Sequence, residues 1–197
     1  MTTGWKYGKT LKERLMTLEE PGKALLFDAA KGLVEEITQK FDVGTVARSL
    51  QGKDEKEAHK ALEELGKKVM KLTIELADTK YLDRTGEMVE KVSRQTGISF
   101  PHRLGRYVEL SIFGLRPTDR WNISRATTRE VLLQVSACTV HKALEEAGIK
   151  GLPCKGFCFA SFETAAEKTG DRINIEMPKE LPQNSMCEFH ISVQPGG

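Results

Sequence analysis

The sequence predicts an α+β fold in which a helical N-terminal region precedes a C-terminal antiparallel sheet with two short helices. Three observations support this prediction. Apolar residues recur at spacings of three and four through the first 120 residues, as in amphipathic helices. After about residue 124 the period changes to two in "TTREVLLQVSA", as in a strand. Two further alternating stretches, "RINIEM" and "MCEFHISV", follow near the C-terminus.

The helical region is predicted to cover residues 1–120, and its longest helix is "DEKEAHKALEELGKKVMKLTIELA". Asp54 is suited to be its N-cap, and Glu57 three residues later resembles a capping box. Its apolar residues form one stripe, which is typical of a face packed in a core. Other helices are expected in "KTLKERLMTLEE", "GKALLFDAAKGLVEEITQKF", "GEMVEKVSRQ" and "PHRLGRYVELSIF".

The C-terminal region, residues 121–197, is predicted to alternate strands with helices. A strand over 127–137 leads into the helix "CTVHKALEEAG", which Gly148 is suited to end. The second short helix is "CFASFETAAEKTG", and the strands "RINIEM" and "MCEFHISV" come after it. The two regions form either separate units or one compact domain.

Composition narrows the class of protein. Among 197 residues, 39% are hydrophobic and 29% charged, which is typical of a soluble globular chain. The 30 basic and 28 acidic residues are interspersed, so charge gives no reason to expect nucleic-acid binding. No apolar run approaches the ~20 residues that span a membrane, and the N-terminus lacks the apolar segment of a secretory signal. We therefore expect a cytoplasmic protein that binds neither nucleic acid nor membrane.

The four cysteines all lie within the last 60 residues, and Cys138 falls where a strand passes into a helix. The first turn of a helix stabilises a thiolate, and His141 lies one turn further along. Cys138 and His141 are therefore a candidate nucleophile and base. In the alternative interpretation, Cys138 is a small buried side chain and His141 faces solvent.

The other cysteines allow a metal site. Cys154 and Cys158 lie four residues apart, on one face of the expected helix, and this is an accepted spacing for zinc ligands. Cys138 and Cys187 complete a possible set of four. Cys187 lies on the apolar face of the last strand, where core packing is its default role. A zinc site, a Cys138 nucleophile and plain core cysteines therefore all stay open, whereas disulfides are disfavoured inside a cell.

Two further groups are candidates for substrate binding. Arg103 and Arg106 recur at helical spacing and suit a planar carboxylate, although the same residues also fit a solvated face. Arg120 is expected in a loop with a similar ambiguity. Phe157 and Phe159 either form the wall of a pocket for an apolar or planar ligand or fill the core.

The order of these C-terminal segments resembles the L-2-amino-thiazoline-4-carboxylic acid hydrolase-like family, and it is similar, more distantly, to the 4-vinyl reductase-type small-molecule-binding domain. The resemblance covers about a third of the chain. It rests on "SACTVHKALEEAGI", "LPCKGFCFASF", "RINIEM" and "MCEFHISV", with Cys138, Cys154 or Cys158, Cys187 and Gly148. The stretch "KGFCFASF" is more apolar than the hydrolase pattern.

The resemblance implies two functions. The first is a hydrolase of a small cyclic compound containing sulfur and nitrogen, or of a planar one, with Cys138 as nucleophile, His141 as base and Arg103 or Arg106 holding a carboxylate. The alternative is a non-catalytic ligand-binding or sensing module whose cysteines hold zinc. A helical scaffold with core cysteines is a third class. We also expect a homodimer, because isologous dimers are the commonest oligomers.

Overall fold

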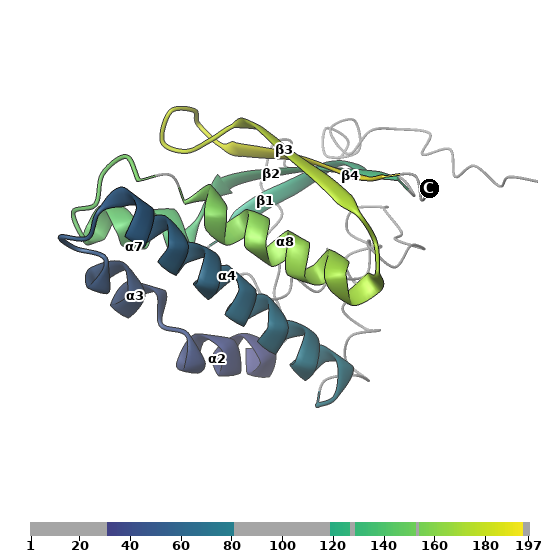
Figure 1. The fold of residues 1–197 in the computed structure, drawn as a ribbon, viewed down its shortest axis with the longest axis horizontal. Helices are drawn as coiled ribbons and strands as arrows, with labels where there is room; N and C mark the ends of the chain where they lie inside the picture. The colour runs from purple at the N-terminus through teal and green to yellow at the C-terminus, as the bar shows by residue number, and fades with distance from the viewer. Residues whose placement is uncertain (1–30, 81–118, 127–128, 153, 195–197) are drawn as a thin grey trace, which may run out of the picture.

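The computed structural model describes residues 31–80, 119–126, 129–152 and 154–194. Within them, helices precede a four-stranded antiparallel sheet, which confirms the predicted α+β class (Figure 1). The elements are α2 (Lys31–Lys40), α3 (Val43–Ser49), α4 (Glu55–Asp78), β1 (Arg120–Ala126), β2 (Glu130–Ala137), α7 (Thr139–Glu146), α8 (Lys155–Thr169), β3 (Ile173–Lys179) and β4 (Cys187–Val193).

The sheet has the strand order β1-β2-β4-β3, and all neighbours are antiparallel. In the central pair Leu133 lies opposite Phe189 and Val131 opposite Ile191, and all four are buried. The period of two in the sequence therefore produces one buried face on β2 and β4.

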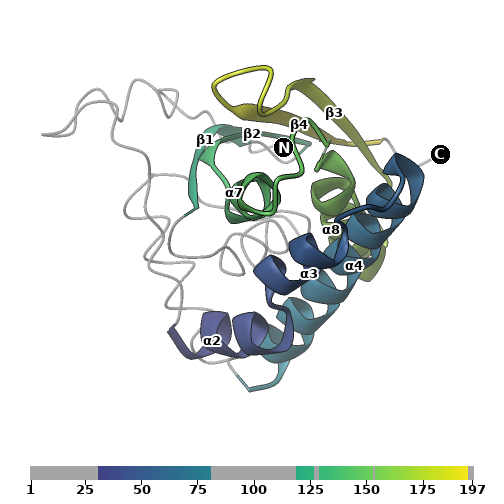
Figure 2. The same ribbon diagram turned by 90° about the vertical axis from the view of Figure 1, so that its left-hand side faces the viewer.

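Helices cover one face of this sheet in two layers. Helices α7 and α8 lie against the sheet, and α4 packs on α8 on the side away from the strands (Figures 1 and 2). Helix α3 packs on α7, where the Gln51 amide donates a hydrogen bond of 2.6 Å to the carbonyl oxygen of Ala147. The helices next to the sheet thus come from the C-terminal part of the chain, and the outer layer comes from the N-terminal part.

The close approach of α4 and α8 depends on a glycine. A Cβ atom at Gly66 would overlap the carbonyl oxygen of Phe157. Because glycine has no side chain, the two helix backbones can touch at this point. The long predicted helix is confirmed here, and its N-cap Asp54 accepts a hydrogen bond of 2.8 Å from the backbone N–H of Glu57.

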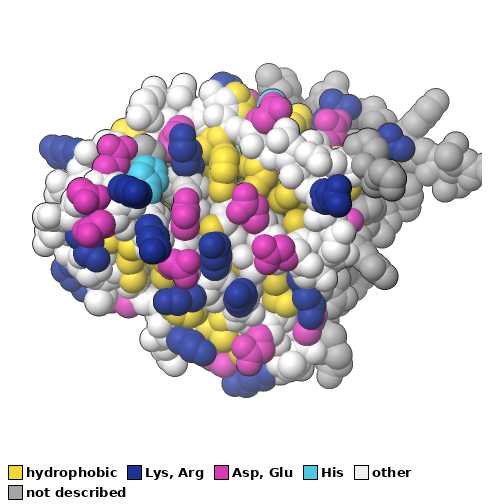
Figure 3. All heavy atoms as spheres, viewed as in Figure 1, with side chains coloured by type: hydrophobic (Ala, Val, Ile, Leu, Met, Phe, Trp, Pro, Cys, Tyr) yellow, Lys and Arg dark blue, Asp and Glu magenta, His cyan; other side chains and the backbone are white. Residues whose placement is uncertain are grey.

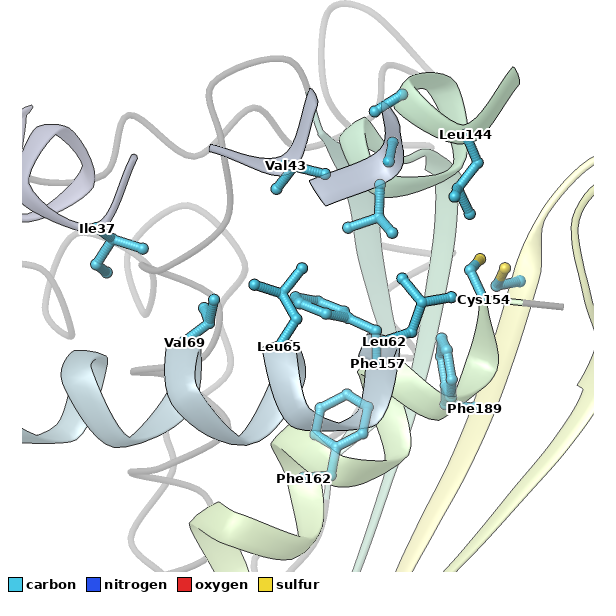
Figure 4. Close-up of a cluster of buried hydrophobic side chains, with 14 of the residues drawn as sticks. Ile37, Val43, Leu62, Leu65, Val69, Leu144, Cys154, Phe157, Phe162 and Phe189 are labelled. Carbon is cyan, nitrogen blue, oxygen red and sulfur yellow. The ribbon is translucent and has the colours of Figure 1, made fainter. Parts of the chain in front are cut away.

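One hydrophobic core connects the helices with the sheet. Side chains from α3, α4, α7, α8 and β4 face the same interior (Figure 4). Phe189 of β4 is 1% exposed and packs edge-to-face against Phe162 and Phe159, with ring centroids 5.6 and 6.4 Å away. Such aromatic pairs contribute about 0.5–1.5 kcal/mol each beyond the burial of their area.

Two elements differ from the sequence prediction. Strand β1 was not expected, and Arg120 begins this strand instead of lying in a loop. Its register with β2 shifts twice, so the alternation that identifies a strand is interrupted. Helix α3 was also not expected. The helices predicted in "KTLKERLMTLEE", "GEMVEKVSRQ" and "PHRLGRYVELSIF" lie outside the described residues.

Candidate functional site

The four cysteines lie at or near the starts of three elements, α7, α8 and β4. Cys138 is the N-cap residue between β2 and α7, and Cys154 is the N-cap residue of α8. Cys158 lies one turn further along α8, and Cys187 opens β4. All four are unbridged and belong to the main core or pack against it. We call these four residues the thiol cluster.

Burial keeps most of the thiol cluster protonated. Burial raises the pKa of Cys154 far above its usual range, and the sulfurs of Cys138 and Cys187 raise it further. Cys158 retains some exposed surface as a residue, but burial still raises its pKa well above 9.0, followed by the effect of the other three sulfurs. Burial also raises the pKa of Cys187. These mutual effects require the sulfurs to lie near one another, and these three are neutral thiols at pH 7.

Asp119 is a buried carboxylate beside the cluster that the sequence did not reveal. It is 3% exposed and accepts hydrogen bonds from the backbone N–H and the hydroxyl of Thr139, at 2.5 and 2.6 Å. It therefore caps α7, whereas the side chain of the N-cap residue Cys138 makes no capping bond. Its charge contributes to the raised pKa of Cys158. The capping pair is separated by 20 residues, so no local motif predicts it.

Glu180 is a second carboxylate that was missed, because "PKELPQNS" reads only as a polar connection. Its backbone oxygen accepts hydrogen bonds from the backbone N–H and side-chain amide of Asn184, at 2.9 and 3.2 Å. The next N–H, of Leu181, donates to the sulfur of Cys187 at 3.4 Å. These bonds hold the loop over the start of β4, where Glu180 raises the pKa of Cys154 and Cys187.

The carboxylate of Glu180 is incompletely satisfied. Its Oε1 atom is buried and has no hydrogen-bond partner among the described residues. A buried acceptor without a donor typically costs about 1–3 kcal/mol, and more when it is charged. The missing donor at this atom therefore calls for an explanation.

The predicted base has another partner. The Nε2 atom of His141 lies 3.5 Å from Oε1 of Glu145, one turn along α7, and the histidine side chain is only 15% exposed. The structure therefore pairs His141 along its own helix. The roles of Cys138 as nucleophile and His141 as base stay predictions.

The predicted substrate-binding residues do not form one site among the described residues. Phe157 is buried in the core between α4 and α8, so its core interpretation fits. Phe159 is half-buried and lines a groove of about 240 Å³ between these helices, with the polar side chains of His59, Glu63, Lys67, Lys155 and Glu163. Arg103 and Arg106 lie outside the described residues.

A second groove lies between the C-terminal halves of α4 and α8. Its volume is about 550 Å³, and Ile74 and Thr164 line it together with lysine and carboxylate side chains. Basic and acidic side chains alternate over this face of the molecule (Figure 3). No cysteine lines either groove, so the thiol cluster is a separate place in the fold.

The predicted zinc site is not supported. In the described part of the chain, no three or more histidine, cysteine, aspartate or glutamate side chains are placed to hold a metal ion. The four cysteines lie near one another without forming a coordination geometry.

No known protein family and no curated protein matches the sequence. Among solved structures, the Fe(II) unliganded H-NOX protein from K. algicida has a TM-score of 0.41 at 9% identity, covering 83% of this chain and 94% of that one. An H-NOX protein from S. oneidensis in the Fe(II)NO ligation state has a TM-score of 0.40 at 12% identity, covering 94% and 89%. Likeness at this level assigns no function.

These comparisons correct one expectation. The predicted membership of the thiazoline-carboxylate hydrolase-like family, and the distant similarity to the vinyl reductase-type domain, are wrong. Neither family matches, and the solved structures found are H-NOX proteins. The short cysteine-containing segments occur at strand and helix ends, where core packing alone can produce such an order.

Two remaining expectations concern membrane association and the oligomeric state. Among the described helices, none combines the length and apolar character that crossing a membrane requires. The homodimer stays a prediction, because the structure contains one chain.

Proposed function

We propose that this chain is a non-catalytic small-ligand-binding or sensing module, and that its ligand binds at the thiol cluster. One observation carries the proposal: the starts of three elements, α7, α8 and β4, bring four thiols together at one junction, beside the unsatisfied Oε1 of Glu180. A buried polar atom without a partner is rare in folded proteins and calls for an explanation. A ligand that donates a hydrogen bond to it is the simplest explanation.

The ionisation of three of the four thiols favours a binding role for those three over a covalent one. A cysteine nucleophile acts as the thiolate, which needs a lowered pKa. The pKa values of Cys154, Cys158 and Cys187 are instead raised, mainly by burial. Neutral thiols are polarisable and weakly polar, so they suit the wall of a binding site.

The position of the cluster suits a sensor. A ligand held there would contact the start of α7, the start of α8, the start of β4 and the loop before it. These elements join the sheet to the two helical layers (Figure 2). A ligand that favours one arrangement of this junction would therefore shift the relative positions of several elements.

A ligand screen by thermal unfolding tests this proposal. A compound at 100 times its Kd should stabilise the chain by about 2.7 kcal/mol and protect the thiols from alkylation. Cys158→Ser should weaken this stabilisation, because it alters the thiol wall. Ser136→Ala, at an exposed position of β2, is the matched control and should keep it.

Two outcomes would contradict the proposal. A ligand that stabilises the native chain and Cys158→Ser equally binds elsewhere. Turnover of a bound compound that disappears in Cys138→Ser would instead establish catalysis by the cysteine.

A further inference from the structure

We infer that the thiol cluster binds a small organic cation, such as an alkylammonium or alkylguanidinium, with its charged N–H group directed at Oε1 of Glu180. This inference rests on the proposed function and names the chemical class of the ligand. Three features of the described residues lead to it.

The first feature is the acceptor itself. Oε1 of Glu180 is buried without a partner among the described residues. The hydrogen bonds from Asn184 to the Glu180 backbone, and from Leu181 to Cys187, fix the backbone from which this side chain extends. A carboxylate accepts hydrogen bonds only, so its natural complement is a donor, and a charged donor makes the stronger bond.

The second feature is the sign of the local charge. Glu180 acts on Cys154 and Cys187 to oppose a negative sulfur, and Asp119 does the same at Cys158. Two carboxylates that disfavour an anion favour a cation at the same place. Asp119 already accepts two hydrogen bonds from Thr139, so Glu180 is the carboxylate with capacity left for a ligand.

The third feature is the apolar character of the side chains around the thiol cluster. Leu152 and Leu181 are half-buried and pack against the core beside the cysteines. Neutral thiols and leucine side chains favour a short apolar body over a second charge. Cys138 and Cys158 are half-buried residues, whereas Cys154 and Cys187 are buried. These properties describe a monovalent cation with a small hydrocarbon part.

A matched set of four-carbon probes tests the class. Butylammonium, butylguanidinium, butanol and butyrate are added to the full chain at equal ionic strength with a chelator present, and unfolding is followed against temperature. The two cations should raise Tm, whereas butanol and butyrate should not. Glu180→Gln keeps the shape and removes the charge, so it should weaken cation binding at least about tenfold. Glu176→Gln, on the exposed face of β3, is the control and should bind as the native chain does.

The outcomes separate this inference from the proposed function. If butanol or butyrate stabilises the chain and the cations do not, the ligand class is wrong, and loss of that effect in Cys158→Ser keeps the proposed function. If no probe raises Tm, or if Glu180→Gln binds the cations as tightly as the native chain, the inference is overturned. If Glu180→Gln weakens binding and Cys158→Ser does not, the acceptor is correct and the thiol cluster is not its site.

Discussion

Ser161 of α8 places its hydroxyl oxygen 3.2 Å from the carbonyl oxygen of Gly66 in α4. The same hydroxyl lies 2.8 Å from the carbonyl oxygen of Phe157, one turn back on its own helix. Ser161 is buried, so its hydroxyl is satisfied entirely at this helix contact. The contact fixes α8, and with it two of the four cysteines, against α4.

Gly66→Ala should destabilise the protein strongly. The added methyl group would overlap the carbonyl oxygen of Phe157, and neither helix backbone can move without disturbing the core. Overpacking of this kind typically costs about 1–3 kcal/mol. Urea unfolding measures the change. Gly44→Ala is the control, because a methyl group there makes only ordinary contacts, and a helical Gly→Ala change stabilises by about 0.5–1 kcal/mol. Equal effects of the two substitutions would refute the role of the close approach.

Asp119 should have two separable effects, on the cap of α7 and on the thiols. Asp119→Ala removes the bonds to Thr139 and should lower the free energy of unfolding by about 1–2 kcal/mol. Asp119→Asn keeps an acceptor at the cap and removes the charge, so it should cost less and lower the pKa of Cys158. Alkylation of Cys158 followed against pH by mass spectrometry measures that pKa. An unchanged profile in both variants would contradict the electrostatic contact.

Stability should fall as the solution becomes alkaline. The folded-state pKa values of Cys154, Cys158 and Cys187 lie above the ordinary value of 9.0. Above pH 9 the unfolded chain therefore loses thiol protons that the folded chain keeps, so the unfolded state becomes relatively more favourable. Below this pH the three thiols are protonated in both states and contribute no slope. Urea unfolding from pH 7 to 10.5 should show the decline, and Cys158→Ser should make it shallower. An identical slope in native and variant chains would exclude Cys158 as a cause.

Asp54→Ala should weaken the start of α4. The carboxylate accepts the N–H of Glu57, and loss of such a cap typically costs about 1 kcal/mol. Asp54→Ser, which retains a capping oxygen, should restore most of this loss. Circular dichroism during thermal unfolding compares the three chains, and a Ser variant no better than Ala would argue against the cap.

The sequence was sufficient to predict an element wherever one local pattern determines its structure. The Asp54 cap and the apolar stripe of α4 predict a helix almost to its last residue, and period two predicts β2 and β4. Cys138 is an N-cap residue, as the change of period there indicates, whereas α8 begins at Lys155, ahead of the predicted start at Cys158, with Cys154 as its N-cap.

The carboxylates of the candidate site were beyond such patterns. Asp119 caps a helix that begins 20 residues later, after a strand pair with two register shifts. Glu180 belongs to the candidate site because its loop lies over the start of β4. The hydrogen bonds from Asn184 to the Glu180 carbonyl oxygen and from the Leu181 N–H to the Cys187 sulfur hold the loop there. Sequence spacing indicated which residues end an element, but not which distant side chain meets them there.

The pairing of α4 with α8 also has a consequence for the order of folding. The Ser161–Gly66 hydrogen bond joins residues 95 apart in the chain, so a long loop must close when the two helices dock. Contacts at this separation slow folding, because the entropy of closing a long loop is lost before the contact is gained. During synthesis the apolar stripe of α4 leaves the ribosome well before its partner helix exists. Until α8 has been made, the newly synthesised N-terminal part therefore exposes an apolar surface that is prone to aggregation. A chaperone that binds exposed apolar helices should raise the yield of native protein.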